Sequence, residues 1–338
     1  MNNKSLFSRF VLFLIVTLLL INIFIPLQYN FQYPAKLGPE FNAGVKNEHL
    51  EKINKTDPDL ILIGDSTLEE GIDADRLSEN LGIRTYKAAI PGSGTTSWYL
   101  FMKNIVFEAK RHPKYVAVLF RVTMLTVPQY RTTGKYFFLL DDYAQKNEPL
   151  VSELTFINQM SPFERLAQQY LPVYTARVDI REDLDNALRY RFPSMLAGCD
   201  RACTDNAVGS IFGREVDPVA LNLAQDDAAK TLYDPKEMNF NQQLSTSLLP
   251  YMIELMQKNN STLILIRTKI YGPETQALEE YTKALDAYLV QQDNIILLDY
   301  SNDPRILKSY YADTLHMNPY GKYEFTNILA ADIQNRIK

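Results

Sequence analysis

Short apolar runs alternate with amphipathic stretches in two parts of the chain, residues 57–125 and 260–338. A run with no polar face is typical of a strand buried on both sides in a parallel sheet, and the stretches between have helical spacing. The alternation therefore predicts an α/β fold, a doubly wound parallel sheet flanked by helices. The expected strands are Leu60–Ile63, Arg84–Ala89, Tyr115–Phe120, Thr262–Ile266 and Asn294–Asp299.

Three helices are predicted around the later strands. Thr95–Arg111 repeats its apolar residues at helical spacing, and Thr95 or Thr96 is a suitable N-cap. The amphipathic stretch Glu274–Gln291 separates the last two strands. A final helix is expected from Asn318 onward, so that each of the last two strands is followed by a helix.

The N-terminal segment has the pattern of a membrane span. Phe10 to Ile25 is an apolar run of 16 residues with two polar interruptions, and Lys4 and Arg9 precede it. A cleaved signal peptide and an uncleaved anchor share this pattern, but the residues after the run lack the small side chains of a peptidase site. We expect residues 1–30 to be an anchor, with the N-terminus cytoplasmic and the rest extracytoplasmic.

The remaining chain divides into a linker and one large domain. Residues 31–56 are the expected linker and residues 57–338 the domain. Within the domain, residues 128–258 break the alternation and are rich in proline and aromatic residues. A connection of this length is an insertion, largely helical by its pattern, which either borders a site or serves only as a packing subdomain.

Composition excludes several classes of function. Lys and Arg total 35 against 40 Asp and Glu, so no basic excess exists for a nucleic-acid partner. Three histidines leave little room for a histidine-rich metal site, and no sequence pattern indicates a cofactor. Cys199 and Cys203 stand four apart, and in an oxidising compartment we expect a local disulfide, with a metal pair as the alternative.

Candidate chemistry lies where the predicted strands end. Ser66 follows the first strand in Gly64-Asp65-Ser66, a glycine-rich turn containing Gly92 follows the second, and Asp313-Thr-Leu-His316 follows the last. Carboxyl ends of parallel strands share one edge of the sheet, where ligands bind. A serine nucleophile requires a base such as histidine, and the histidine requires a carboxylate that fixes its tautomer.

In these blocks and their order the chain resembles the SGNH (GDSL-type) hydrolase superfamily. Ile63-Gly64-Asp65-Ser66 matches the nucleophile block, Gly92 the second, and Asp313-x-x-His316 with Asn318-Pro319-Tyr320-Gly321 the last. The resemblance covers the sheet but not the insertion, and implies a flavodoxin-like three-layer fold. It implies that Ser66 is the nucleophile, His316 its base and Asp313 the orienting acid, with the Ser66 and Gly92 amides binding the oxyanion.

The third block of the family departs from its pattern. The family places Gly-x-Asn-Asp after the third strand, with the asparagine as an oxyanion donor, and this chain has Arg121-Val122-Thr123-Met124. Thr123 occupies the asparagine position. It is either the third oxyanion donor, through its hydroxyl, or an ordinary strand residue. Asp65, Arg121 and Arg267 are the candidates for substrate contact.

The anchor, the extended nucleophile loop and the altered third block resemble the membrane-anchored branch that acts in bacterial cell-surface O-acetylation. That likeness implies transfer of an acetyl group to a glycan acceptor, with a membrane-bound O-acyltransferase as donor partner. The alternatives are a carbohydrate esterase using the same residues and a catalytically silent scaffold that binds glycan.

Overall fold

The computed structural model describes residues 3–30, 32–39, 41, 44–132, 136–191, 194–195, 198–200, 202–203, 230–271 and 275–337. The chain forms two compact units. The N-terminal unit comprises Met1–Pro39 and Phe156–Gln225, and the sheet unit comprises Glu40–Thr155 and Asp226–Lys338. The chain therefore leaves the sheet unit once and returns to it.

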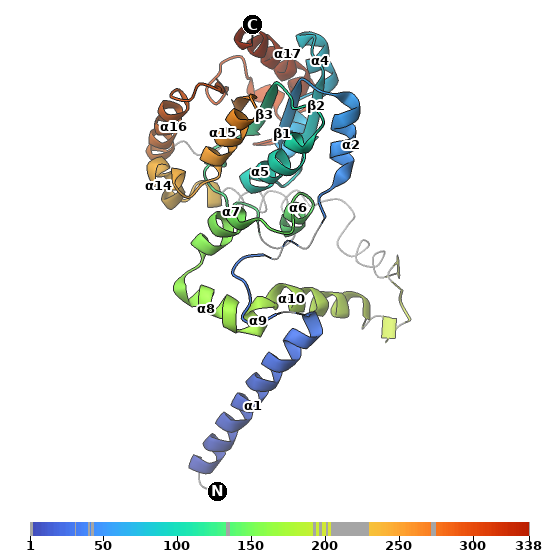
Figure 1. The fold of residues 1–338 in the computed structure, drawn as a ribbon, viewed down its shortest axis with the longest axis vertical. Coiled ribbons are helices and arrows are strands. Elements are labelled where there is room, and N and C mark those ends of the chain that lie inside the picture. The colour runs from blue at the N-terminus through green and yellow to red at the C-terminus, as the bar shows by residue number, and fades with distance from the viewer. Residues whose placement is uncertain are drawn as a thin grey trace. The chain divides into compact units, whose positions relative to one another are not determined.

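The sheet unit contains five parallel strands in the order β2-β1-β3-β4-β5, which confirms the predicted fold class. The strands are β1 (Leu60–Gly64), β2 (Thr85–Ala89), β3 (Tyr115–Phe120), β4 (Thr262–Arg267) and β5 (Ile295–Asp299). This is the flavodoxin-like order, whose direction of winding reverses between β1 and β3. Figure 1 shows the strands among the helices of this unit.

One face of the sheet carries a continuous apolar core. Leu62 of β1 pairs in register with Ala117 of β3, which pairs with Ile264 of β4, and all three side chains are buried. Against this row pack three helices, α3 (Ser66–Gly71), α4 (Ala74–Leu81) and α17 (Pro319–Arg336). Because alternate strand residues point to opposite faces, the continuous apolar runs bury both faces.

Helices from both halves of the sheet unit cover the opposite face. α5 (Thr95–Asn104) packs on α15 (Leu249–Lys258), and α15 lies against β4. α16 (Gln276–Leu289) contacts β5. The other elements of the unit are α2 (Asn47–Thr56), α6 (Phe137–Asp141), α7 (Pro149–Val151), α14 (Phe240–Leu244) and the 3₁₀ turns Val106–Glu108, Pro235–Met238 and Lys308–Tyr310.

Two local predictions about the helix from Thr95 are wrong. The helix ends at Asn104 rather than Arg111, and a 3₁₀ turn follows Ile105. Its N-cap is Gly94, which has no side chain to cap the helix. The hydroxyl of Thr96, one of the two predicted caps, donates to the Pro128 carbonyl at 2.6 Å instead. A tertiary contact thus takes the hydroxyl that a local cap would use.

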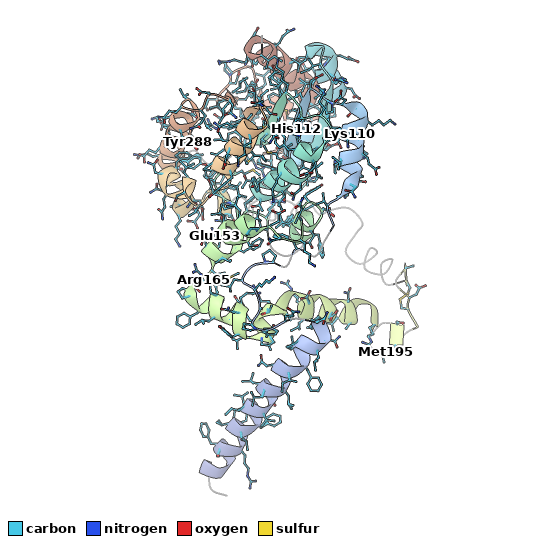
Figure 2. All side chains as sticks on the ribbon, viewed as in Figure 1. Lys110, His112, Glu153, Arg165, Met195 and Tyr288 are labelled. Atoms are coloured by element: carbon cyan, nitrogen blue, oxygen red, sulfur yellow. A yellow bond between two sulfur atoms is a disulfide. The ribbon has the colours of Figure 1, made fainter. Side chains whose placement is uncertain are left out.

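The N-terminal unit begins with α1 (Asn3–Tyr29), which contains the apolar segment Phe7–Tyr29. This segment of 23 residues has a mean hydropathy of 2.9 and is long enough to cross a membrane, and its most apolar stretch has no buried residue. Figure 2 shows its side chains projecting from the helix. Two functions share this description, a membrane anchor and a signal sequence.

The described residues of the unit's second segment are mostly helical. This segment contains α8 (Pro162–Tyr170), α9 (Pro172–Thr175), α10 (Arg177–Asn186), a 3₁₀ turn at Ile157–Gln159 and a π-helical turn at Ala187–Arg191, and another π-helical turn, Ser152–Phe156, reaches the unit boundary. A capping box of Ser161 and Glu164 begins α8. Cys199 and Cys203 form the expected disulfide.

Two predicted boundaries differ from those of the structure. The expected linker 31–56 contains α2, whose Ile53 is buried in the sheet unit. The expected insertion 128–258 is divided, because residues 156–225 belong to the N-terminal unit and its flanks belong to the sheet unit. Many residues from 192 to 229 lie outside the described residues.

Candidate active site

Ser66 begins helix α3 directly after β1. Asp65 is the N-cap, and its carboxylate accepts hydrogen bonds from the Thr67 backbone N–H at 2.9 Å and the Thr67 hydroxyl at 2.7 Å. The turn is tight, because a Cβ atom on Gly64 would lie 2.8 Å from the Leu68 Cβ. Glycine at the end of β1 therefore lets α3 start at once and holds Ser66 at the carboxyl edge of the sheet.

Asp313 and His316 lie in a tight loop before α17. An isolated antiparallel bridge between Tyr311 and Met317 closes the loop. Inside it, one Asp313 carboxylate oxygen accepts the backbone N–H groups of Leu315 at 2.7 Å and His316 at 2.6 Å. These hydrogen bonds fix the loop in a tight turn beside the start of α17.

The structure brings Ser66, His316 and Asp313 together. The Ser66 Oγ lies 2.9 Å from His316 Nε2, and His316 Nδ1 lies 2.8 Å from an Asp313 carboxylate oxygen. Burial acts to raise the pKa of Asp313, but the hydrogen bonds from His316 and Leu315 outweigh it and lower this pKa. An ionised Asp313 favours the imidazole proton on Nδ1, so that Nε2 can accept the serine proton.

Two backbone N–H groups are available beside the serine. Ile90 N donates to the Gly64 carbonyl at 2.8 Å, which joins the turn after β2 to the end of β1. Among the described residues, neither the Ser66 nor the Gly92 N–H donates a hydrogen bond. Gly92 has a φ of 81°, and a Cβ there would lie 2.8 Å from the Tyr136 ring. Glycine thus permits both this backbone conformation and the approach of Tyr136.

Asp65 and Arg121 form a buried ion pair rather than substrate contacts. Their exposed fractions are 3% and 5%, and the Arg121 guanidinium donates to the Asp65 carboxylate. The second guanidinium nitrogen donates to the Tyr130 hydroxyl at 3.2 Å. Burial acts to raise the pKa of Asp65, but the charge of Arg121 and the Thr67 hydrogen bonds outweigh it and lower this pKa. The substrate-contact prediction for both residues is corrected on this ground.

Arg267 is corrected in the same way. Its guanidinium is held by Asp286 at 2.6 Å and by Asp299, and only 4% of the residue is exposed. The arginine ties the end of β4 to α16 and to the end of β5. Two carboxylates therefore neutralise the charge that was expected to bind substrate.

Thr123 does not direct its hydroxyl proton to the site. The residue is fully buried, and its Oγ1 donates to the Leu232 carbonyl at 2.7 Å. The preceding Val122 has a φ of 48°, a left-handed conformation that costs a β-branched residue about 1–3 kcal/mol. The third block therefore contains a strained turn and holds the segment in which the chain returns to the sheet unit. The prediction that the Thr123 hydroxyl donates to the oxyanion is corrected on this ground.

The remaining histidines serve packing. His49 has its Nδ1 2.7 Å from the Tyr86 hydroxyl and its ring against Phe101. His112, labelled in Figure 2, contacts the Phe107 ring edge-on. No group of three or more metal-ligating side chains occurs among the described residues.

The sequence reasoning missed the Asp65–Arg121 pair and its partner Tyr130. A signal for the pair existed, because opposite charges directly follow β1 and β3, which are adjacent and parallel. Tyr130 carried no such signal, since it lies in the irregular segment after β3.

Two solved structures are similar to this chain over most of its length. One is of a protein from Desulfitobacterium hafniense DCB-2 described as lipolytic and of the G-D-S-L family, with 11% identity, a TM-score of 0.37, and 81% of this chain and 98% of that chain covered. The other is of a GDSL-like lipase from Bacteroides thetaiotaomicron VPI-5482, with 10% identity, a TM-score of 0.38, and coverages of 82% and 88%.

No family model and no curated protein matches the sequence. The chain is similar to GDSL-type proteins, the superfamily that its sequence blocks also resemble.

Proposed function

We propose that the protein is an SGNH-type acyl-transfer enzyme that works through an acyl-enzyme on Ser66. The observation that carries this proposal is the hydrogen-bonded series from Ser66 Oγ to His316 Nε2 and from His316 Nδ1 to Asp313. This arrangement lies at the carboxyl ends of the strands, beside the position where the winding of the sheet reverses. The side chains of His316 and Asp313 are 21% and 29% exposed, which leaves room for a substrate.

In the first step the Ser66 Oγ attacks the carbonyl carbon of an acyl ester while His316 Nε2 takes the serine proton. The tetrahedral oxyanion accepts hydrogen bonds from the Ser66 and Gly92 N–H groups, and each such donor is typically worth about 3 kcal/mol. The C–O bond to the leaving alcohol then breaks, and His316 returns the proton to that oxygen. The product is acyl-Ser66 and a free alcohol.

In the second step a hydroxyl group attacks the acyl-Ser66 carbonyl and gives its proton to His316. The bond to the Ser66 Oγ breaks, and the proton returns to the serine. A sugar hydroxyl in this role produces an acylated glycan, whereas water produces a free acid. The two reactions share every protein group in the site, so acceptor access distinguishes them.

We favour acetyl transfer to an extracytoplasmic glycan over ester hydrolysis. The support is α1, which is apolar enough to hold the site beside a membrane acyl donor. The proposed donor partner is a membrane-bound O-acyltransferase. The Cys199–Cys203 disulfide supports an oxidising location for the unit that contains it. The proposed topology is a single span with a cytoplasmic N-terminus.

Covalent labelling of the full chain in detergent tests the acyl-enzyme. The protein is mixed with p-nitrophenyl acetate, and the adduct is located by intact mass and peptide mapping. We expect one acetyl group on Ser66, none after Ser66→Ala and far less after His316→Ala. Ser245→Ala, at an exposed serine of the sheet unit, is the matched control and should label as the wild type does.

An adduct that persists in Ser66→Ala contradicts the proposal. Absence of any adduct in folded wild-type protein favours the scaffold alternative. Where labelling succeeds, the ratio of acetylated sugar to free acetate is measured as the sugar concentration rises. Acetate release that ignores the acceptor identifies an esterase instead of a transferase.

The topology has its own test. Single cysteines introduced at exposed positions of the sheet unit are treated with a membrane-impermeant thiol reagent in intact cells. We expect the cysteines to be labelled in intact cells. We also expect the protein to stay in the membrane fraction after alkaline extraction. Labelling only after lysis contradicts the extracytoplasmic location.

A further inference from the structure

Arg131 lies against the glycine turn of the candidate site. Its Nη1 is 3.4 Å from the position that a Cβ on Gly92 would take. The Tyr136 ring borders the same glycine, with its nearest carbon 2.8 Å from that position. A substrate whose carbonyl oxygen reaches the Gly92 N–H therefore passes beside the Arg131 guanidinium.

The guanidinium is held in place by tyrosines. Arg131 Nε donates to the Tyr130 hydroxyl at 3.0 Å, and that hydroxyl also accepts from Arg121. The charged carbon of the Arg131 guanidinium lies 4.6 Å from the centre of the Tyr136 ring and 5.5 Å from that of Tyr130. The Arg131 backbone has a φ of 54°, a conformation that few non-glycine residues adopt. These contacts orient the side chain before any ligand arrives.

The charge of Arg131 is not neutralised as those of its neighbours are. Arg121 pairs with Asp65, and Arg267 pairs with Asp286 and Asp299. Among the described residues no carboxylate pairs with Arg131, and its two terminal nitrogens donate no hydrogen bond. Its half-buried position reduces the screening of this charge by water.

We propose that Arg131 binds an anionic group on the glycan, so that the substrate class is an acidic carbohydrate. This inference rests on the proposed acyl-transfer function. The planar fork of a guanidinium matches a carboxylate or a phosphate with two parallel hydrogen bonds. Such a contact next to the oxyanion position fixes which hydroxyl or ester of an acidic sugar faces Ser66. Arg131 is thus a specificity-determining residue.

Three matched esters test this inference with the full chain in detergent. They are acetylated methyl glucoside, acetylated methyl glucuronoside and acetylated methyl glucoside 6-phosphate, which differ only at C6. We expect wild-type kcat/KM to be higher for at least one anionic ester than for the neutral one. In Arg131→Gln this ratio should fall about 10–100-fold, the loss expected for a charged hydrogen bond. The two anionic esters distinguish a carboxylate from a phosphate.

Arg76→Gln is the matched control. Arg76 also stacks on a tyrosine, with its guanidinium carbon 3.5 Å from the centre of the Tyr323 ring, and also donates from Nε, to Asn327. Its substitution should leave the ratio at the wild-type value. Arg131→Lys keeps the charge but loses the fork, so its ratio should be intermediate.

Equal loss on neutral and anionic esters in Arg131→Gln overturns the inference, as does a wild-type enzyme without preference for either anion. Where Arg131→Gln does not fold, the wild-type ratio must fall as NaCl is raised, and a constant ratio overturns the inference. Calorimetric binding of methyl glucuronoside and methyl glucoside 6-phosphate needs no turnover. Binding of neither overturns the inference, whereas binding without Ser66-dependent turnover shows that only the proposed function has failed.

Discussion

Arg121 donates to the buried carboxylate of Asp65, the residue immediately before Ser66. The pair joins the carboxyl ends of β1 and β3 beneath the candidate nucleophile. Asp65 also caps α3 through Thr67, so one carboxylate serves the helix and the ion pair together. The altered third sequence block is therefore a structural support for the serine.

Arg121→Gln should reduce the free energy of unfolding by about 3–5 kcal/mol, because it leaves the Asp65 charge buried without a partner. Urea denaturation measures the loss. The double variant Asp65→Asn with Arg121→Gln should lose less than Arg121→Gln alone, since asparagine keeps the capping oxygen and removes the charge. A double variant that is as unstable as the single one or worse contradicts this account.

Asp313→Asn should lower the rate of p-nitrophenol release from p-nitrophenyl acetate by about 10²–10⁴-fold. Asparagine can keep the loop hydrogen bonds to the Leu315 and His316 N–H groups. Its amide, when it faces His316 Nδ1, moves the imidazole proton to Nε2 and removes the base. Asp293→Asn, at an exposed aspartate, is the control, and an equal loss in both variants contradicts the assigned role of Asp313.

The ionisation of Asp141 makes the free energy of unfolding depend on pH. Burial and the nearby charge of Asp142 raise the pKa of Asp141 to about 6, and one of its buried oxygens has no hydrogen-bond partner among the described residues. The folded state therefore holds this proton more tightly than the unfolded state. Its contribution to stability is complete below the unfolded pKa of about 3.9 and is lost as the pH rises through about 6.

Asp141→Asn should remove this pH dependence of the free energy of unfolding. Because the side chain is partly exposed, we expect a gain of about 1 kcal/mol at pH 7.5 and little change at pH 4, measured by urea denaturation at both values. Asp293→Asn should show no comparable difference. A gain that is the same at both pH values indicates a packing effect instead of a proton.

Gly321→Ala should disturb the loop that holds His316. A Cβ on Gly321 would overlap the Tyr310 carbonyl oxygen, so the start of α17 must move away. We expect a loss of about 2 kcal/mol or more in unfolding free energy, together with reduced labelling of Ser66. Gly71→Ala is the matched helical control, since no atom lies within 4 Å of its Cβ position, and a loss of similar size there refutes the argument.

The strands were predictable because their residues are apolar on both faces, which leaves a run that needs no tertiary information. The meeting of Ser66 with His316 was predictable for a related reason, since parallel strands end at one edge. The roles of Thr96 and Thr123 were not, because each hydroxyl donates to a carbonyl far away in the chain. No periodic pattern in the sequence records such a contact. α2 was missed for another reason, because its mean polarity is that of a linker although Ile53 is buried.

Ser66 and its hydrogen-bond partner His316 are separated by 250 positions in the chain. Ser66 is therefore synthesised long before His316. The two can meet only after the second segment of the N-terminal unit has been made and the chain has returned to the sheet unit. During synthesis, and during the proposed passage across a membrane, Ser66 has no contact with His316. Under the proposed function, acyl chemistry on Ser66 begins only once the sheet unit has closed, so acetyl labelling of this residue would also report complete folding.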